Sequence, residues 1–183
     1  MRAEVAAMAG AQLFAPELPL VPAYTLTLAL TRGPRWERAG GAFGGWLGLG
    51  YQYPGLYQGE AVGADVQTAS VRAGVSWEIQ SARVVLIRVG LGAGMDRLHY
   101  RPRGGNATVT LAQASSFNAP VASLWTGVEL RLLDWLALTT RIAADAALTK
   151  IHFDLHEEAG QTSQVLVPYA VRPTFVIGLA LVD

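Results

Sequence analysis

The chain of 183 residues has the length of a single domain, expected to cover 1–183, and it contains no cysteine. Its 14 basic and 14 acidic residues give a formal net charge of zero and form no continuous basic stripe, which argues against a nucleic-acid partner. The mean hydropathy is +0.29, yet the sequence has no run of about 18 apolar residues, so no transmembrane helix is expected.

Four strands are predicted in the first half of the chain, because apolar residues alternate there with polar or small ones. They cover residues 2–14, 24–31, 43–53 and 65–79. A proline-bounded loop follows the first strand, residues 33–40 follow the second, and Pro54-Gly55 is expected to end the third. No signal-peptide pattern precedes the first strand, so an exported form would be a mature chain or a barrel cut from a longer one.

Four further strands are predicted in the second half. The fifth covers residues 83–100, the sixth and seventh form a hairpin over 120–150 with a tight turn at 133–135, and the last covers 165–181. In the hairpin the even positions are mostly apolar and the odd positions carry the charges; the parity slips near Lys150, which predicts a bulge there. Turns at 80–82 and 133–135 are tight, whereas the connections after the odd-numbered strands are long. This alternation is typical of an up-and-down barrel with both termini at the tight-turn end.

The polar face of these strands is rich in glycine and poor in lysine, since Lys150 is the single lysine of the chain. The glycines alternate on the third and fifth strands: Gly44, Gly48, Gly50, Gly90, Gly92 and Gly94. Glycine weakens a strand but leaves room where backbones or large side chains crowd, as they do inside a narrow barrel. We therefore expect the charged, glycine-rich face inside and the apolar face against lipid. A soluble lipocalin-like barrel that binds an apolar ligand in its centre is the alternative.

The aromatic residues fall into two groups that match the two ends of such a barrel. The tight-turn end is expected to carry Trp36, Trp77 and Trp135. The long-loop end is expected to carry Phe14, Tyr24, Tyr51, Tyr53, Tyr57, Tyr100 and Tyr169. Aromatic girdles at both membrane interfaces are a feature of outer-membrane barrels.

Eight alternating strands, a short turn around Asp134-Trp135 and a last strand near the carboxyl terminus resemble the small outer-membrane barrels, such as the transmembrane domain of OmpA-type proteins. The resemblance covers nearly the whole chain. It implies an all-β, eight-stranded antiparallel up-and-down transmembrane β-barrel in the outer membrane of a Gram-negative bacterium. It also implies contact with outer-membrane lipid, lipopolysaccharide and the barrel assembly machinery. One departure is the ending Leu181-Val182-Asp183, where members of this class usually end on an aromatic residue.

Charged residues at inward positions are expected to form an ionic network inside the barrel. This network comprises Arg72, Glu78, Arg88, Glu129, Arg131, Arg141, Asp145 and Arg172, together with Asp96. Glu129 falls diagonally across from Arg141, and Asp145 falls at the height of Arg172. Because a buried charge needs a partner, we expect a salt-bridged plug and a structural or anchoring role. The alternative is a narrow pore in which the excess of arginine favours small anions.

Three arginines at the far end of the fifth strand, Arg97, Arg101 and Arg103, are expected at the long-loop end, where they could meet lipopolysaccharide phosphates. A solvated basic loop is the alternative.

The segment His152-Phe153-Asp154-Leu155-His156-Glu157-Glu158 is the one cluster of catalytic residue types. Asp154 and His156 could in principle activate a water molecule. Spacing fixes no nucleophile or second carboxylate pair nearby, and histidines four residues apart share a face only on a helix. We therefore expect no enzymatic activity, no metal site and no cofactor.

Overall fold

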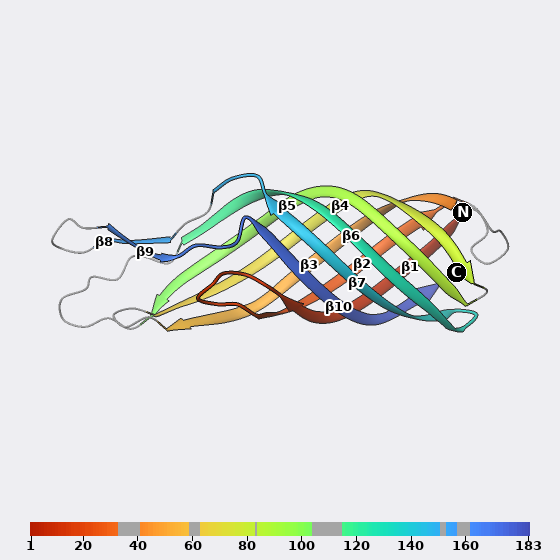
Figure 1. The fold of residues 1–183 in the computed structure, drawn as a ribbon, viewed down its shortest axis with the longest axis horizontal. Helices are drawn as coiled ribbons and strands as arrows, with labels where there is room; N and C mark the ends of the chain where they lie inside the picture. Colours follow the sequence, from red (N-terminus) through yellow and green to blue (C-terminus); the bar gives the residue numbers. More distant parts are fainter. Residues whose placement is uncertain (33–40, 59–62, 83, 104–114, 151–152, 157–161) are drawn as a thin grey trace.

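The structure is a computed structural model that describes residues 1–32, 41–58, 63–82, 84–103, 115–150, 153–156 and 162–183. Its main body is a closed barrel whose strands follow one another around the wall in the order β1-β10-β7-β6-β5-β4-β3-β2 (Figure 1). The barrel strands are β1 (Arg2–Gln12), β2 (Val21–Thr31), β3 (Gly41–Gln58), β4 (Gly63–Ala82), β5 (Val85–Arg103), β6 (Ser115–Leu133), β7 (Leu136–Ala147) and β10 (Val171–Val182). The predicted fold, an eight-stranded antiparallel barrel, is confirmed.

Ring closure pairs the first strand with the last. β1 and β10 run antiparallel from Glu4 opposite Val182 to Gln12 opposite Thr174. Both chain ends therefore lie at one end of the barrel, and Figure 1 shows that the tight turns lie at the same end. We call this the turn end and the opposite one the loop end. No helix among the described residues is long and apolar enough to cross a membrane.

The loop end differs from the prediction in three places. β3 continues through Pro54 to Gln58, because a register shift between Gln52 and Gly55 accommodates the proline. β7 ends at Ala147 without the expected bulge near Lys150. The expected last strand is split into β9 (Thr162–Leu166) and β10, and β9 pairs with β8 (Phe153–His156) in a separate hairpin. This hairpin projects beyond the barrel wall (Figure 1).

The outer wall of the barrel is apolar and the interior is polar. Leu91, Val75 and Ile142 on the outside are 60%, 62% and 58% exposed. On β6, Leu130 is 42% exposed, whereas the adjacent Glu129 is 3% exposed. Successive side chains of a strand point to opposite faces, so every barrel strand contributes to both surfaces. The predicted assignment of faces is confirmed, and it is the reverse of what a lipocalin-like barrel requires.

Two tryptophans, Trp46 and Trp125, lie inside the barrel and explain several of its glycines. Their rings meet edge to face with centroids 5.7 Å apart. A side-chain carbon on Gly90 would overlap the indole of Trp125, and one on Gly92 would lie 2.7 Å from the indole of Trp46. Gly90 and Gly92 thus provide space that these two side chains fill.

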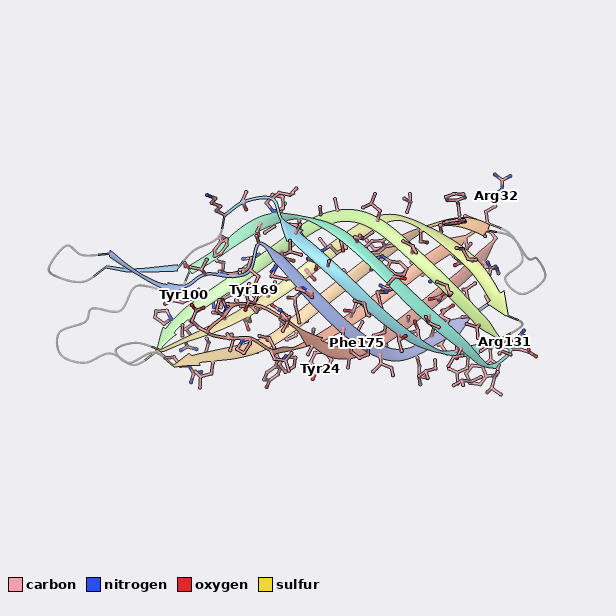
Figure 2. The ribbon with its side chains drawn as sticks, in the orientation of Figure 1. Tyr24, Arg32, Tyr100, Arg131, Tyr169 and Phe175 are labelled. Carbon is pink, nitrogen blue, oxygen red and sulfur yellow. The ribbon has the colours of Figure 1, made fainter. Side chains whose placement is uncertain are left out.

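Aromatic residues on the outer wall gather at both ends, as predicted, but not all of the expected residues belong to them. At the turn end Phe43 stacks on Trp77, with ring centroids 6.2 Å apart, and Trp135 is 57% exposed. At the loop end the exposed tyrosines are Tyr24, Tyr51, Tyr53 and Tyr169, of which Figure 2 labels Tyr24 and Tyr169.

Phe14 and Tyr100 were expected in the girdle at the loop end, and this expectation is wrong. They lie inside the barrel and are only 1% and 8% exposed. Tyr100 occupies an inward position of β5, and Phe14 follows the end of β1, so neither side chain reaches the wall. Trp36 and the side chain of Tyr57 lie outside the described part of the structure.

Candidate functional site: the barrel interior

One cluster of charges, centred on Arg88, fills the interior toward the turn end. Arg88 donates from Nη1 and Nη2 to the two carboxylate oxygens of Glu4, at 3.0 and 2.7 Å, and also from Nη2 to Glu78. Glu78 accepts further hydrogen bonds from Arg2 at 3.0 Å and from Thr31 at 2.8 Å. Glu129 lies with Oε2 3.9 Å from Arg88 Nη2. We call Arg2, Glu4, Glu78, Arg88 and Glu129 the turn-end cluster.

A second cluster lies closer to the loop end and joins four strands across the lumen. Arg72 on β4 pairs with Asp96 on β5 at 2.6 Å and with Asp145 on β7 at 3.2 Å. Arg172 on β10 also pairs with Asp96. The side chains of Arg172 and Asp96 are each only 1% exposed. These four residues form the loop-end cluster.

Arg141 lies between the two clusters without a carboxylate in direct contact among the described residues. Its guanidinium carbon is 3.9 Å from the ring centroid of Trp125, and Nη1 donates to Thr27 at 3.1 Å. Cation–π contact of this kind holds a desolvated guanidinium over an aromatic face. Together with both clusters, Arg141 gives five arginines and five carboxylates in the described interior, so the charges balance.

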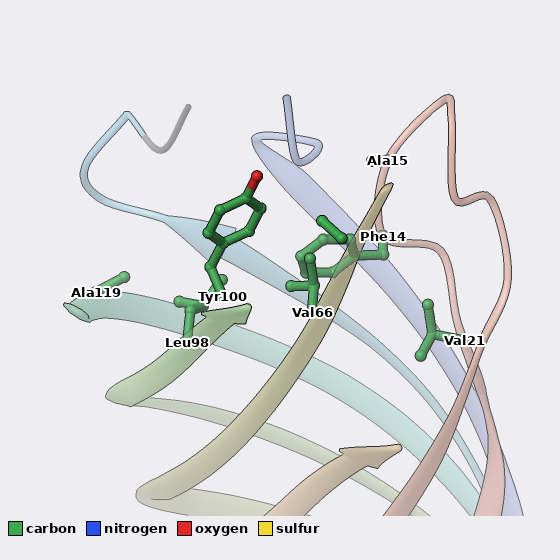
Figure 3. Packing of buried hydrophobic residues seen from close by; sticks show 8 residues of the cluster. Phe14, Ala15, Val21, Val66, Leu98, Tyr100 and Ala119 are labelled. Carbon is green, nitrogen blue, oxygen red and sulfur yellow. The ribbon is translucent and has the colours of Figure 1, made fainter. Parts of the chain in front are cut away.

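The loop end of the lumen is closed by apolar side chains (Figure 3). This loop-end stopper comprises Phe14, Ala15, Val21, Ala64, Val66, Leu98, Tyr100 and Ala119. None of these side chains is more than 8% exposed. On β5 the inward positions change from Gly94 and Asp96 to Leu98 and Tyr100, so the lining turns from polar to apolar toward the loops.

A cavity of about 90 Å³ remains within the lumen and is bordered by Arg72, Trp125, Arg141 and Asp145. Toward the loops lies the stopper, and toward the turns lies the buried turn-end cluster, in which Glu4, Glu78 and Arg88 are 2–4% exposed. The described side chains therefore fill the interior at both ends of this cavity.

The structure brings most of the predicted network residues together, but through different pairs. Arg172 lies directly opposite Asp145 in the β10–β7 register, and Arg141 is diagonal to Glu129, as expected. The ion pair of Arg172 nevertheless goes to Asp96, and Arg141 lies on Trp125.

Arg131, predicted as a member of the network, has an ion pair with the turn. It lies at the turn end of the barrel (Figure 2) and pairs with Asp134 of the turn, three residues along the chain. The reason is its place at the end of β6, where the register shifts as the chain enters the turn.

Sequence reasoning missed Glu4 and Arg2 as members of the network. The inward parity of Glu4 was visible, but its partner Arg88 is 84 residues away and lies across the lumen. Only closure of the ring through the β1–β10 pair brings the two together.

The three arginines expected to meet lipopolysaccharide are exposed near the loop end of β5. Arg103 pairs with Asp65 on β4, and Arg101 lies directly opposite the same aspartate. Arg97 borders a hollow on the outer wall, with Tyr51, Gln67 and His99.

The segment 152–158, expected to be the only cluster of catalytic residue types, lies largely outside the described residues. The backbone of Asp154 and His156 belongs to β8, but their side chains, like His152, Glu157 and Glu158, are not described. In the part of the chain that is described, no three His, Asp or Glu side chains converge as they would to hold a metal ion.

No protein-family model and no curated protein matches this sequence. The fold is similar to a major outer membrane protein from Thermus thermophilus, with a TM-score of 0.59, 15% identity and 99% of each chain covered. Neisserial surface protein A gives a TM-score of 0.58 at 9% identity over 98% of this chain and 95% of that chain. The outer membrane protease OmpT from Escherichia coli gives 0.53 at 8% identity over 91% of this chain and 65% of its own.

At these identities the likeness concerns the fold, which the geometry above describes independently. Strand number, antiparallel order and closure agree with the small outer-membrane proteins, and so does a wall that is apolar outside and polar inside. The chain has the fold of the small eight-stranded outer-membrane β-barrels.

Proposed function

We propose that this protein is a structural or anchoring barrel of a Gram-negative outer membrane whose interior is plugged by its own side chains. The observation that carries the proposal is the filled lumen: a charge-balanced ionic network followed by an apolar stopper. Eight-stranded barrels are just wide enough for side chains to fill them. The exposed leucines, valines and isoleucines of the wall would face lipid, and the loops would face the cell exterior.

A narrow pore for small anions is the second candidate, and the interior argues against it. Its arginines are matched by carboxylates, so the described lumen offers no surplus of positive charge to an anion. An ion would also have to cross the stopper, where Leu98 and Ala119 are 0% exposed and the described side chains are hydrocarbon apart from the hydroxyl of Tyr100, too little to replace its hydration shell.

A non-enzymatic role is part of the same proposal. The similarity to the protease OmpT means that the fold itself does not decide the matter. The buried carboxylates of the described lumen are engaged with arginines as structural ion pairs. The partners we propose are outer-membrane lipid, lipopolysaccharide and the barrel assembly machinery, with no cofactor.

Planar bilayer recording of the refolded protein tests the plug. Folding is first verified by a heat-dependent position on a gel, which outer-membrane barrels show and a lipocalin-like protein would not. We expect no steady single-channel current from the wild-type protein. The double variant Leu98→Ser/Tyr100→Ser thins the stopper and should still conduct poorly, because the turn-end cluster remains. A large, stable, anion-selective current from folded wild-type protein would refute the plug and support the pore.

A further inference from the structure

A polar hollow lies on the outer wall near the loop end, on the side formed by β3 to β6. It has a volume of about 340 Å³. Its lining residues come from four strands: Tyr51, Gln67, Ala69, Arg97, His99 and Ser116. On a wall that is mainly apolar, a group of polar side chains gathered at one height is expected at a ligand site or at the boundary with solvent.

The strand register explains the shape of this hollow. Ala69 lies directly opposite Arg97, and Gln67 lies directly opposite His99. The small side chain of Ala69 leaves a depression between its longer neighbours. Tyr51 donates to Gln67 at 3.4 Å, and His99 Nδ1 lies 2.8 Å from Ser116 Oγ, so the polar rim is held in place by its own contacts.

Arg97 differs from the other two basic residues of this region. The guanidinium of Arg103 pairs with Asp65, and Arg101 lies directly opposite the same aspartate. Arg97 lies opposite Ala69 instead, and no described carboxylate pairs with it. A guanidinium offers its donors in a fork that fits two oxygens of a phosphate, and the second ring nitrogen of His99 can add a further contact. Arg97 is thus the cation of this surface that is best placed to take an anion.

The surroundings of the hollow identify the kind of anion. Two residues closer to the turn end, three of these four strands, β3, β4 and β5, carry Leu49, Val71 and Met95, which are 50%, 43% and 42% exposed. A ligand that occupies both surfaces needs a charged head and an apolar tail. A free phosphate ion would satisfy the first surface only.

We infer that this hollow binds the phosphate of a lipid headgroup in the leaflet at the loop end, with the lipid tail lying along Leu49, Val71 and Met95. The inference rests on the proposed membrane-spanning function. It assigns the lipid contact to Arg97 with His99 and Tyr51, and it leaves Arg101 and Arg103, which face Asp65, outside the site.

The test places the folded barrel in nanodiscs of zwitterionic phosphatidylcholine that contain a small fraction of a bisphosphorylated lipid A. Lipid retained by the protein after transfer to detergent is counted by native mass spectrometry. Arg97→Gln should lower retention of the phosphorylated lipid about tenfold, the value of a charged hydrogen-bonded contact. Arg32→Gln is the matched control, because Arg32 is an exposed arginine at the opposite end of the barrel (Figure 2).

A second variant, Ala69→Trp, fills the hollow while keeping Arg97, and it should lower retention as well. Equal retention by wild type, Arg97→Gln and Ala69→Trp would overturn the inference. An equal loss in the Arg32→Gln control would also overturn it, because the effect would then be nonspecific charge attraction. Displacement of the lipid by millimolar inorganic phosphate would identify free phosphate as the ligand and contradict the lipid assignment. Failure of the proteins to insert, seen as no heat-dependent shift on a gel, would instead refute the proposed membrane function.

Discussion

The two ends of the lumen are built by the same strands with the same alternation, yet they are filled by opposite chemistry. The turn-end cluster contains five charged side chains, four of them buried, whose ion pairs join neighbouring strands and also cross the lumen. The loop-end stopper buries eight residues that carry no charge. Ion pairs in a dry interior depend on each specific partner, whereas apolar contacts depend on volume. The stability of the turn-end half of the lumen should therefore depend on specific ion-pair partners, and that of the loop-end half on the volume of its apolar side chains.

Removal of Arg88 should produce the largest loss of stability. Arg88→Met leaves the carboxylates of Glu4 and Glu78 buried without their shared cation. We expect a loss of about 3 to 5 kcal/mol in the free energy of unfolding, measured by urea titration of the barrel in phospholipid vesicles.

Two further variants sharpen this prediction. The triple variant Arg88→Met/Glu4→Gln/Glu78→Gln should recover part of the loss, because neutral side chains no longer require a counter-charge. Arg131→Met should cost much less, since Arg131 and Asp134 pair at the exposed rim. Equal losses for Arg88→Met and Arg131→Met would mean that the turn-end cluster contributes no more to stability than an ion pair at the exposed rim.

Truncation of an apolar side chain in the stopper should lower the free energy of unfolding by a smaller amount, which depends on the volume removed. Leu98→Ala removes a fully buried side chain, and we expect a loss of about 2 to 4 kcal/mol in the same titration. Leu98→Met, which nearly conserves the volume, should lose about 1 kcal/mol. If the two substitutions lower the free energy of unfolding equally, packing volume does not determine the stability of this end of the lumen.

The smallest loss of stability is expected at Gly90, which lies between the turn-end cluster and the loop-end stopper. Gly90→Ala places a methyl group against the indole of Trp125, and crowding of this kind typically costs about 1 to 3 kcal/mol. Adding Trp125→Leu to the same chain should restore part of the stability, because the conflict disappears. Gly45→Ala is the control, since its methyl group would meet only the carbonyl oxygen of Gly74 at 3.8 Å. A loss as large at Gly45 would point to strand flexibility as the cause.

The residues that face outward on the barrel wall could be predicted from the sequence, because strand alternation is a local property. Parity alone placed Leu130 outside and Glu129 inside, and the tight turn at Asp134-Trp135 fixed which residues lie opposite each other on β6 and β7. The same reasoning placed Arg172 across from Asp145. These relations involve strands that are neighbours on the wall, and no knowledge of the closed ring is needed.

The ion pairs and apolar contacts inside the lumen could not be predicted in the same way. The pairs Arg88–Glu4, Arg72–Asp145 and Arg172–Asp96 join strands that are not neighbours on the wall, so their partners depend on the width and stagger of the closed barrel. The inward places of Phe14 and Tyr100 were missed because an aromatic residue near a strand end was assigned to a girdle. The β8–β9 hairpin was missed because alternation continues from Val165 to Val171 although the chain turns between β9 and β10.

The joining of β1 to β10 has a consequence for how the molecule must assemble. Until that last seam forms, the sheet has two free edges whose unpaired amides would have to remain in hydrocarbon without partners. A single step removes both edges and also brings Glu4 to Arg88. Assembly should therefore be concerted: a chain lacking its first strand would retain the hydrophobic wall of seven strands but would lose both the seal of its backbone and Glu4, one of the carboxylates that neutralise Arg88.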